Sequence, residues 1–282
     1  MWFGLQKIIN FAKVMQIISK IKWVLFNCIS FLPIPLRFYY FAELLSATLQ
    51  GKGWGSSSIK QEVNSCLSVL EYPPKVLIDI GAHHGLYTEQ VLQKFPHIEC
   101  HLFEPSSINI KLLKDKFDHS QEIILNKCAL SNKQTKAKLY SNTPGSVIGS
   151  LTKRRLDHFK RLEHKGYDWE MDEVEEVDLI RFDHYWDKNK YIDFVKIDVE
   201  GHELEVLEGF GDLIKITKLI QFEFGGCNID TKTFFQDFWY FFEEMNFLLY
   251  RITPRGCRLI KFYTPREENF MTTNYVAINQ NI

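Results

Sequence analysis

The segment Val76–Thr88 constrains the fold of this chain more than any other. An apolar run with Asp79 inside it is followed by a turn that contains Gly81 and Gly85, and then by residues compatible with a helix. Because glycine has no side chain, a ligand can lie against the main chain of such a turn, beside the free N–H groups of the helix N-terminus. The segment therefore predicts a buried strand, a ligand-binding turn and a helix, in that order.

A second apolar run, Ile98–Phe103, ends at an acidic residue. This residue, Glu104, comes 25 residues after Asp79. In Rossmann-like sheets, an acid at the tip of the second strand binds the hydroxyl groups of a ribose. We therefore expect a nucleoside-bearing cofactor on the first half of such a sheet, with Gly81, Gly85 and Glu104 in its binding site.

From residue 59 onward, segments typical of strands alternate with segments typical of helices. Apolar runs typical of strands occur at 76–80, 100–103, 123–128, 194–198, 219–224, 248–253 and 275–279, and a short strand is expected at 176–181. The segment 131–175 looks irregular, and 232–245 resembles one helix. Strands that alternate with helices of about 10–15 residues form a mostly parallel sheet with helices on both faces. We therefore predict the α/β class, with ligands bound at the carboxyl ends of the central strands.

The chain is expected to have three parts: a basic and apolar helical extension at 1–50, a Gly/Ser-rich loop at 51–58 and one folded domain at 59–282. Every charged residue within 1–42 is basic. The apolar run Trp23–Leu32 is shorter than the ~20 residues that cross a bilayer. Two hypotheses follow: residues 1–42 lie on the anionic inner face of a membrane, or they pack on the rest of the chain or on a second subunit.

Composition excludes several classes of protein. The net charge of −1 offers no electrostatic argument for nucleic acid as a partner. The six cysteines form no C-x-x-C pair, so a zinc site is not expected, and we interpret them as reduced residues of a cytoplasmic protein. The expected partner is a small-molecule, glycan or lipid-linked substrate, while the oligomeric state is left open.

The residues of the glycine turn discriminate between cofactors. A dinucleotide turn has the pattern G-x-G-x-x-G, but here His83 stands in place of the middle glycine and obstructs a pyrophosphate. Asp79 suits a cationic group, such as the amino group of S-adenosylmethionine. We therefore predict S-adenosylmethionine, with Asp79, Gly81, His83, Gly85 and Glu104 around it. An NAD-dependent oxidoreductase and a non-catalytic binding protein are the alternatives.

A dense set of polar residues follows the strand at 194–198. Asp198 ends this strand, and Glu200, His202 and Glu203 come within five residues of it. Charges at buried strand ends are costly without partners, so the crowding indicates a site. Methyl transfer to a hydroxyl needs a base, and we take Asp198, Glu200 and His202 as the catalytic candidates. For Glu200 and Glu203, first-turn carboxylates at a helix N-terminus are the structural alternative.

Two further interpretations involve charge. Asp198, Glu200, His202 and Glu223 could converge on magnesium or calcium, but their spacing matches no known metal loop, so we predict a site without metal. The run Lys153–Arg155 could bind an anionic acceptor, or it could be a solvated basic turn.

Three motifs together resemble the FkbM family of S-adenosylmethionine-dependent methyltransferases. They are D-I-G-A-H-H-G at 79–85, F-E-P at 103–105 and K-I-D-V-E-G-H-E at 196–203. The resemblance implies a class I methyltransferase fold, a Rossmann-like sheet of seven strands with the last one antiparallel. It places Asp79, Gly81 and Gly85 in the cofactor turn, Glu104 at the ribose and Asp198 in the methyl-transfer crevice. It departs at His83, where the family usually has Asn.

The family resemblance also implies O-methylation. We therefore predict that the protein transfers a methyl group from S-adenosylmethionine to a hydroxyl of a sugar, a glycan or a lipid-linked acceptor.

Overall fold

The structure is a computed structural model that describes residues 2–31, 33–54, 58–159 and 169–282. The chain divides into two compact units, Met1–Ser46 and Ala47–Ile282. Part of the predicted Gly/Ser-rich loop, residues 55–57, lies outside the described residues.

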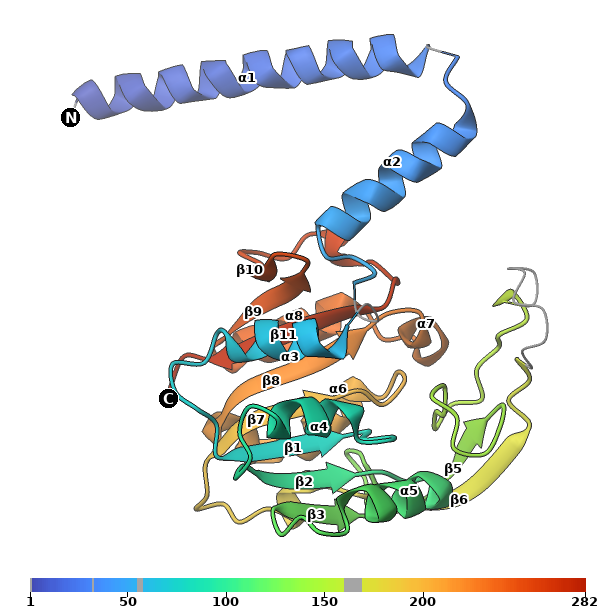
Figure 1. Cartoon of the computed structure of the whole chain (residues 1–282). Helices are drawn as coiled ribbons and strands as arrows, with labels where there is room; N and C mark the ends of the chain where they lie inside the picture. The colour runs from blue at the N-terminus through green and yellow to red at the C-terminus, as the bar shows by residue number, and fades with distance from the viewer. Residues whose placement is uncertain (1, 32, 55–57, 160–168) are drawn as a thin grey trace. The chain divides into compact units, whose positions relative to one another are not determined.

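The smaller unit consists of helix α1 (Trp2–Ser30) and most of helix α2 (Leu36–Leu49), both drawn in blue in Figure 1. Pro33 and Pro35 stand between the two helices, and proline ends a helix because it lacks the N–H group and has a fixed φ. Among the described residues, no helix combines the length and the apolar character needed to cross a bilayer.

The larger unit is built on an eight-stranded sheet with the order β10-β9-β11-β8-β7-β1-β2-β3. Strands β1, β2, β3, β7 and β8 run parallel, and β11 is antiparallel to both of its neighbours, β8 and β9. The strands are β1 (Val76–Ile80), β2 (Glu99–Phe103), β3 (Ile123–Asn126), β7 (Ile192–Ile197), β8 (Thr217–Phe224), β9 (Phe247–Thr253), β10 (Gly256–Leu259) and β11 (Thr273–Asn279).

This sheet confirms the predicted α/β class and the antiparallel last strand. It has one strand more than the seven expected, because the segment after β9 turns back at Gly256 and pairs with β9 as a hairpin. The extra strand, β10, lies at the edge of the sheet, at the opposite end of the strand order from β2 and β3. The central strands are not affected by it and follow the prediction.

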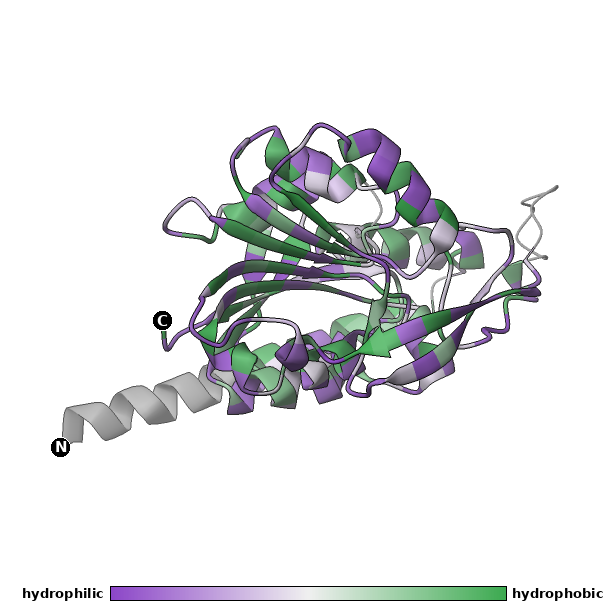
Figure 2. Cartoon of the chain, turned by 90° about the horizontal axis from the view of Figure 1, so that it is seen from below, coloured by the Kyte–Doolittle hydropathy of each residue, from purple (hydrophilic) through white to green (hydrophobic). Residues whose placement is uncertain are grey.

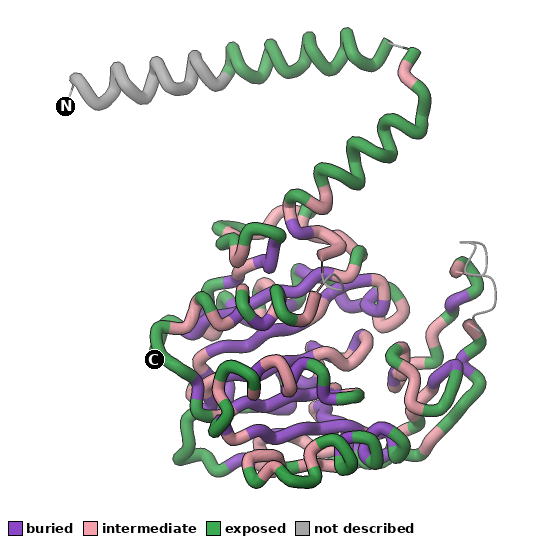
Figure 3. Tube along the Cα trace, viewed as in Figure 1, coloured by how far each residue is buried: buried purple, intermediate pink, exposed green. Residues whose placement is uncertain are grey.

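Helices cover both faces of the sheet, as predicted. Helices α3 (Ile59–Leu67), α4 (Leu86–Leu92) and α5 (Ser107–Phe117) bury side chains in one apolar cluster, and α6 (Glu203–Gly209), η3 (Gly211–Ile216) and α8 (Phe235–Glu244) do so in the other. Strand β1 is buried along four of its five residues, as a central parallel strand between two helical layers should be. Figure 2 shows hydrophobic residues along these strands, and Figure 3 shows the same strands as buried.

Stacked aromatic rings join α8 to the sheet. Phe238 and Phe242 lie one turn apart on α8, and both stack on Phe222 of β8, with ring centroids 4.9 and 5.3 Å away. The preceding helix, α7 (Cys227–Thr231), was not predicted, and Lys232 ends it in a left-handed conformation with φ 59°. The helix predicted for 232–245 therefore begins only at Phe235.

A second, three-stranded sheet includes residues of the segment 131–175, which the sequence indicated as irregular, and the short strand predicted at 176–181. It consists of β4 (Ala129–Leu130), β5 (Thr135–Ser141) and β6 (Glu173–Ile180), in the order β4-β6-β5. Lys136 and Lys138 of β5 lie opposite Asp178 and Glu176 of β6. Opposite charges across β5 and β6 favour the pairing of two polar strands that are far apart in sequence, so local apolar periodicity indicated only the part of β6 from residue 176 onward.

Candidate active site

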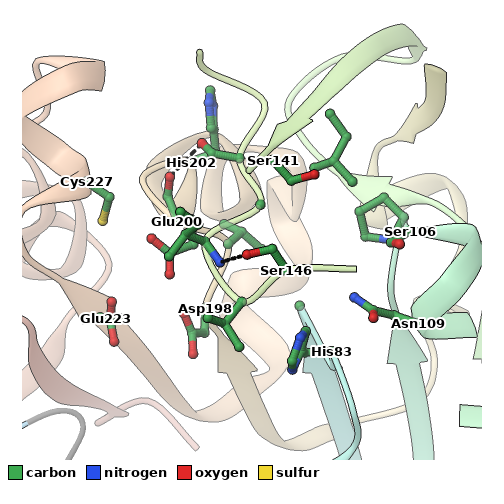
Figure 4. Close-up of a pocket in the computed structure, with 18 of the residues that line it drawn as sticks. His83, Ser106, Asn109, Ser141, Ser146, Asp198, Glu200, His202, Glu223 and Cys227 are labelled. Carbon is green, nitrogen blue, oxygen red and sulfur yellow. Dashed lines mark hydrogen bonds between the residues drawn. The ribbon is translucent and has the colours of Figure 1, made fainter. Parts of the chain in front are cut away.

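A cavity of about 820 Å³ opens at the carboxyl ends of β1, β2, β7 and β8, and residues of the second sheet line another of its walls. Figure 4 shows two groups of side chains facing each other across it. His83, Ser106 and Asn109 lie on one side, and Asp198, Glu200 and Glu223 lie on the other. We call the first the donor side and the second the carboxylate side.

Two glycines shape the turn on the donor side. Gly81 has φ 79°, its N–H donates to the Phe103 carbonyl oxygen at 2.9 Å, and a Cβ placed on it would lie 1.9 Å from the Asp198 carbonyl oxygen. Gly85 caps α4 with φ 68°, and a Cβ there would lie 2.6 Å from the ring of Phe117. Both positions require glycine, because the backbone is left-handed and there is no space for a side chain.

Glu104 is held by the main chain around it. One carboxyl oxygen accepts the N–H of His83 at 2.9 Å, and the other accepts the N–H of Ser106 at 2.9 Å and the side-chain amide of Asn109 at 3.3 Å. Burial raises the pKa of Glu104, against the effect of these donors. The carboxyl group lines the cavity in one fixed orientation, at the tip of β2 where the sequence predicted it.

Asp79 lies beneath the turn and does not line the cavity in the described part of the chain. Its side chain is fully buried, accepts the Thr88 hydroxyl at 2.6 Å and lies 3.9 Å from the Lys196 Nζ atom. The register explains this, because Asp79 and Lys196 are partners on β1 and β7. A direct contact between Asp79 and the amino group of a cofactor stays a prediction, and the geometry instead favours support of the turn from below.

His83 joins the turn to the loop that follows β5. Its backbone is left-handed with φ 49°, its Nε2 atom lies 3.1 Å from the Gly145 carbonyl oxygen, and its ring stacks on that of His84 with centroids 3.7 Å apart. Burial and the neighbouring His84 lower the pKa of His83. A neutral imidazole at the wall of the cavity is therefore expected near neutral pH.

Three carboxylates converge on the carboxylate side. One oxygen from each of Asp198, Glu200 and Glu223 lies within 4.8 Å of the others. Burial and repulsion by Asp198 raise the pKa of Glu200 to about 7, and the same causes raise the pKa of Glu223 well above its usual value. Hard cations such as magnesium bind oxygens of this kind, but His202 is not part of the group, and three acids alone do not define a metal site.

Two buried cations balance these acids. The Lys196 Nζ atom lies 3.1 Å from Asp198, and although burial opposes its charge, Asp198 and Asp79 raise the pKa of Lys196 above its usual value. Arg154 donates to Glu200 at 2.6 Å and to Asp230 at 3.3 Å, and its side chain is 9% exposed. Arg154 is therefore neither part of a solvated basic turn nor a free receptor for an anionic acceptor, which corrects both interpretations of this residue.

His202 and Glu203, the two other predicted residues after Asp198, have different surroundings. The Nε2 atom of His202 lies 3.0 Å from the Thr152 hydroxyl, and Nδ1 lies 3.6 Å from Glu205, so both ring nitrogens have neighbours although the residue lines the cavity. Glu203 is fully buried and accepts the N–H groups of Val199 and Gly201 at 3.1 and 3.0 Å. These hydrogen bonds favour the structural role for Glu203, at the N-terminus of α6, where it holds the backbone on both sides of Glu200.

Sequence reasoning missed two residues of the site. A charged Lys196 inside the apolar strand β7 was a visible signal, because a buried lysine needs acidic partners. Glu62 of α3 had no local signal; it lines the cavity, accepts the side-chain amide of Gln221, and burial raises the pKa of Glu62 to about 7.

The donor side fits a nucleoside with a cationic tail. Glu104 keeps unused lone pairs for hydroxyl donors, and the Asn109 side-chain oxygen is buried at the wall without a hydrogen-bond partner among the described residues. The acids on the opposite wall favour positive charge. The strand order, the glycine turn and Glu104 at the tip of β2 together define a class I methyltransferase.

Comparison with known families identifies the class more narrowly. Residues 79–249, more than half of the chain, match the model of the methyltransferase FkbM domain. The chain belongs to this family, which confirms the resemblance seen in its motifs, and its cofactor is S-adenosylmethionine. A search of curated protein sequences finds no match.

Several solved structures are similar in fold. A methyltransferase FkbM from Methylobacillus flagellatus aligns with 15% identity and a TM-score of 0.45, over 74% of this chain and 45% of the other. An O-methyltransferase from Bacillus cereus aligns with 11% identity and a TM-score of 0.40, over 89% and 93% of the two chains. TrmK from M. capricolum aligns with 11% identity and a TM-score of 0.39, over 78% and 68%. The chain thus spans less than half the length of the Methylobacillus protein.

Proposed function

We propose that this protein methylates a hydroxyl group of a sugar, a glycan or a lipid-linked acceptor. When bound, S-adenosylmethionine supplies an electrophilic methyl group on its sulfonium centre. Gly81, His83, Gly85 and Glu104 hold this donor on one side of the cavity. The observation that carries the proposal is the carboxylate side opposite them, where one oxygen from each of Asp198, Glu200 and Glu223 lies within 4.8 Å of the others at the wall of the cavity.

Glu200 is suited to act as a general base. A hydroxyl must lose its proton as the methyl group is transferred, and a base works best when its pKa lies near the working pH. Glu200 lines the cavity, and the salt bridge to Arg154 fixes its side chain. Asp198, paired with Lys196, orients the reacting groups, and His202 is the alternative base.

The charge of the carboxylate side favours a neutral, hydroxyl-rich acceptor. Ionised carboxylates only accept hydrogen bonds, so Asp198, and Glu200 once it has lost its proton, suit the donor hydroxyls of a carbohydrate. The same acids repel phosphates, which argues against nucleic acid as the acceptor. The dinucleotide alternative lacks support, since His83 stands in the turn where a dinucleotide site has its middle glycine.

The test is transfer of a labelled methyl group. The full chain is incubated with methyl-labelled S-adenosylmethionine and separate cell fractions of neutral glycans, lipid-linked sugars and RNA, and mass spectrometry locates the methyl group. We expect an O-methyl ether on a carbohydrate and formation of S-adenosylhomocysteine. Label on RNA or on nitrogen would contradict the proposal. Donor binding without turnover in any fraction would support a non-catalytic binding protein instead.

A further inference from the structure

The helices of the smaller unit expose an unusual amount of apolar surface. No residue in 16–31 or 33–46 is buried, and most of those positions are exposed (Figure 3). Trp23 and Phe26 on α1 are each 70% exposed, and Phe41 on α2 is 62% exposed. Contiguous exposed apolar surface of this kind marks an interaction site.

The aliphatic residues of α1 gather on one face from residue 16 onward. Ile17, Ile21, Val24 and Cys28 follow the spacing i, i+4, i+7, i+11, which places them in one stripe along the helix. Ile18, Leu25 and Ile29 widen the stripe, Lys20 and Lys22 flank it on its two sides, and Gln16, Ser19 and Asn27 lie beyond Lys20. Trp23 and Phe26 project outside the stripe, so exposed apolar surface extends over more than one face of α1.

All charged residues of these helices are basic except Glu43. Glu43 is the only acid within residues 1–49, and the bases within that range include Lys20, Lys22 and Arg37. Aromatic side chains stand beside them, with Trp23 and Phe26 on α1 and a run of four aromatic residues at 38–41 on α2. Basic, aromatic and aliphatic residues in this combination bind the interface between lipid headgroups and acyl chains.

We propose that α1 and α2 dock this protein on the surface of an anionic lipid membrane. The apolar stripe of α1 enters the headgroup region, and Lys20 and Lys22 contact acidic headgroups. The attachment is peripheral, consistent with the finding that no described helix can cross a bilayer. The inference rests on α1 and α2 alone and does not depend on the methyl acceptor.

The test measures binding of the full chain to vesicles of phosphatidylcholine with and without phosphatidylglycerol. We expect sedimentation with the anionic vesicles, weakened by salt. The double variant Lys20→Glu/Lys22→Glu should bind them roughly tenfold more weakly or worse, since each base near such a surface strengthens binding about fivefold. The matched control Lys111→Glu/Lys114→Glu, on exposed positions of α5, should bind as the wild type does.

A second variant, Ile21→Ser/Leu25→Ser, removes apolar side chains without a change in charge and should also release the protein from vesicles. Titration with S-adenosylmethionine shows whether each variant retains a folded larger unit. Equal binding to neutral and anionic vesicles, or binding that resists salt and alkaline extraction, would overturn the proposal. Absence of vesicle binding together with self-association in ultracentrifugation would show that a second copy of the chain covers this surface.

Discussion

The two sides of the cavity are built in different ways. On the donor side, main-chain groups define the site, because Gly81 and Gly85 adopt left-handed backbone and N–H groups hold Glu104. On the carboxylate side, side-chain charges define it, and Glu200 depends on Arg154 from a distant loop. Figure 4 shows both sides facing the same space. Donor binding therefore depends on the local backbone, whereas proton transfer on the carboxylate side depends on the balance of buried charges.

The largest effect is expected for Gly81→Ala. A Cβ there would overlap the Asp198 carbonyl oxygen at 1.9 Å, so the turn must shift and the tip of β7 with it. We expect a loss of about 3 kcal/mol of stability or more, and no donor binding. Denaturation and calorimetric titration measure both. The control is Gly256→Ala in the β9–β10 hairpin, which also has positive φ but meets no atom within 4 Å and should cost only about 1 kcal/mol.

The second prediction concerns the donor side alone. Glu104→Ala should weaken S-adenosylmethionine binding by about 100-fold, because hydrogen bonds to a charged carboxylate contribute about 1.5–3 kcal/mol each. Calorimetric titration measures the affinity, and the fold should persist. The exposed Glu176→Gln on β6 is the control and should leave the affinity unchanged. Unchanged affinity in Glu104→Ala would remove this residue from the ribose site.

The third prediction separates the two sides. Glu200→Gln keeps the shape of the side chain but removes the base, so turnover should fall by roughly 10²–10⁴-fold. Donor affinity should stay at the wild-type value, since Glu200 lies opposite the donor turn. A variant that loses donor affinity in parallel with turnover would show that the two sides do not act independently.

The smallest effect is expected for Arg154→Gln, and it appears as a pH shift. In the wild type, activity should rise as pH passes through about 7, where Glu200 loses its proton. Arg154 lowers the pKa of Glu200, so its removal should move this rise to higher pH. The control Arg155→Gln removes an exposed ion pair and should leave the profile in place. An unshifted profile in Arg154→Gln would identify another base, with His202 as the candidate.

The donor side and the central strands were predictable because their causes are local. An apolar run, two glycines and an acid at the next strand tip are readable within residues 76–104, and the structure has β1, α4 and β2 where expected. Of the second sheet, only the short strand at 176–181 was predictable in this way, because β5 and β6 carry opposite charges rather than apolar periodicity and pair across more than thirty residues of sequence.

The class of fold, the family and the donor turn could be predicted from the order of residues, since each depends on residues that are close together along the chain. The chemistry of the carboxylate side could not be predicted in this way. Arg154, Lys196 and Glu223 come from different elements, and their mutual distances set which carboxyl group holds a proton near neutral pH. Electrostatic energy depends on distance and burial, and neither quantity is written in the order of residues.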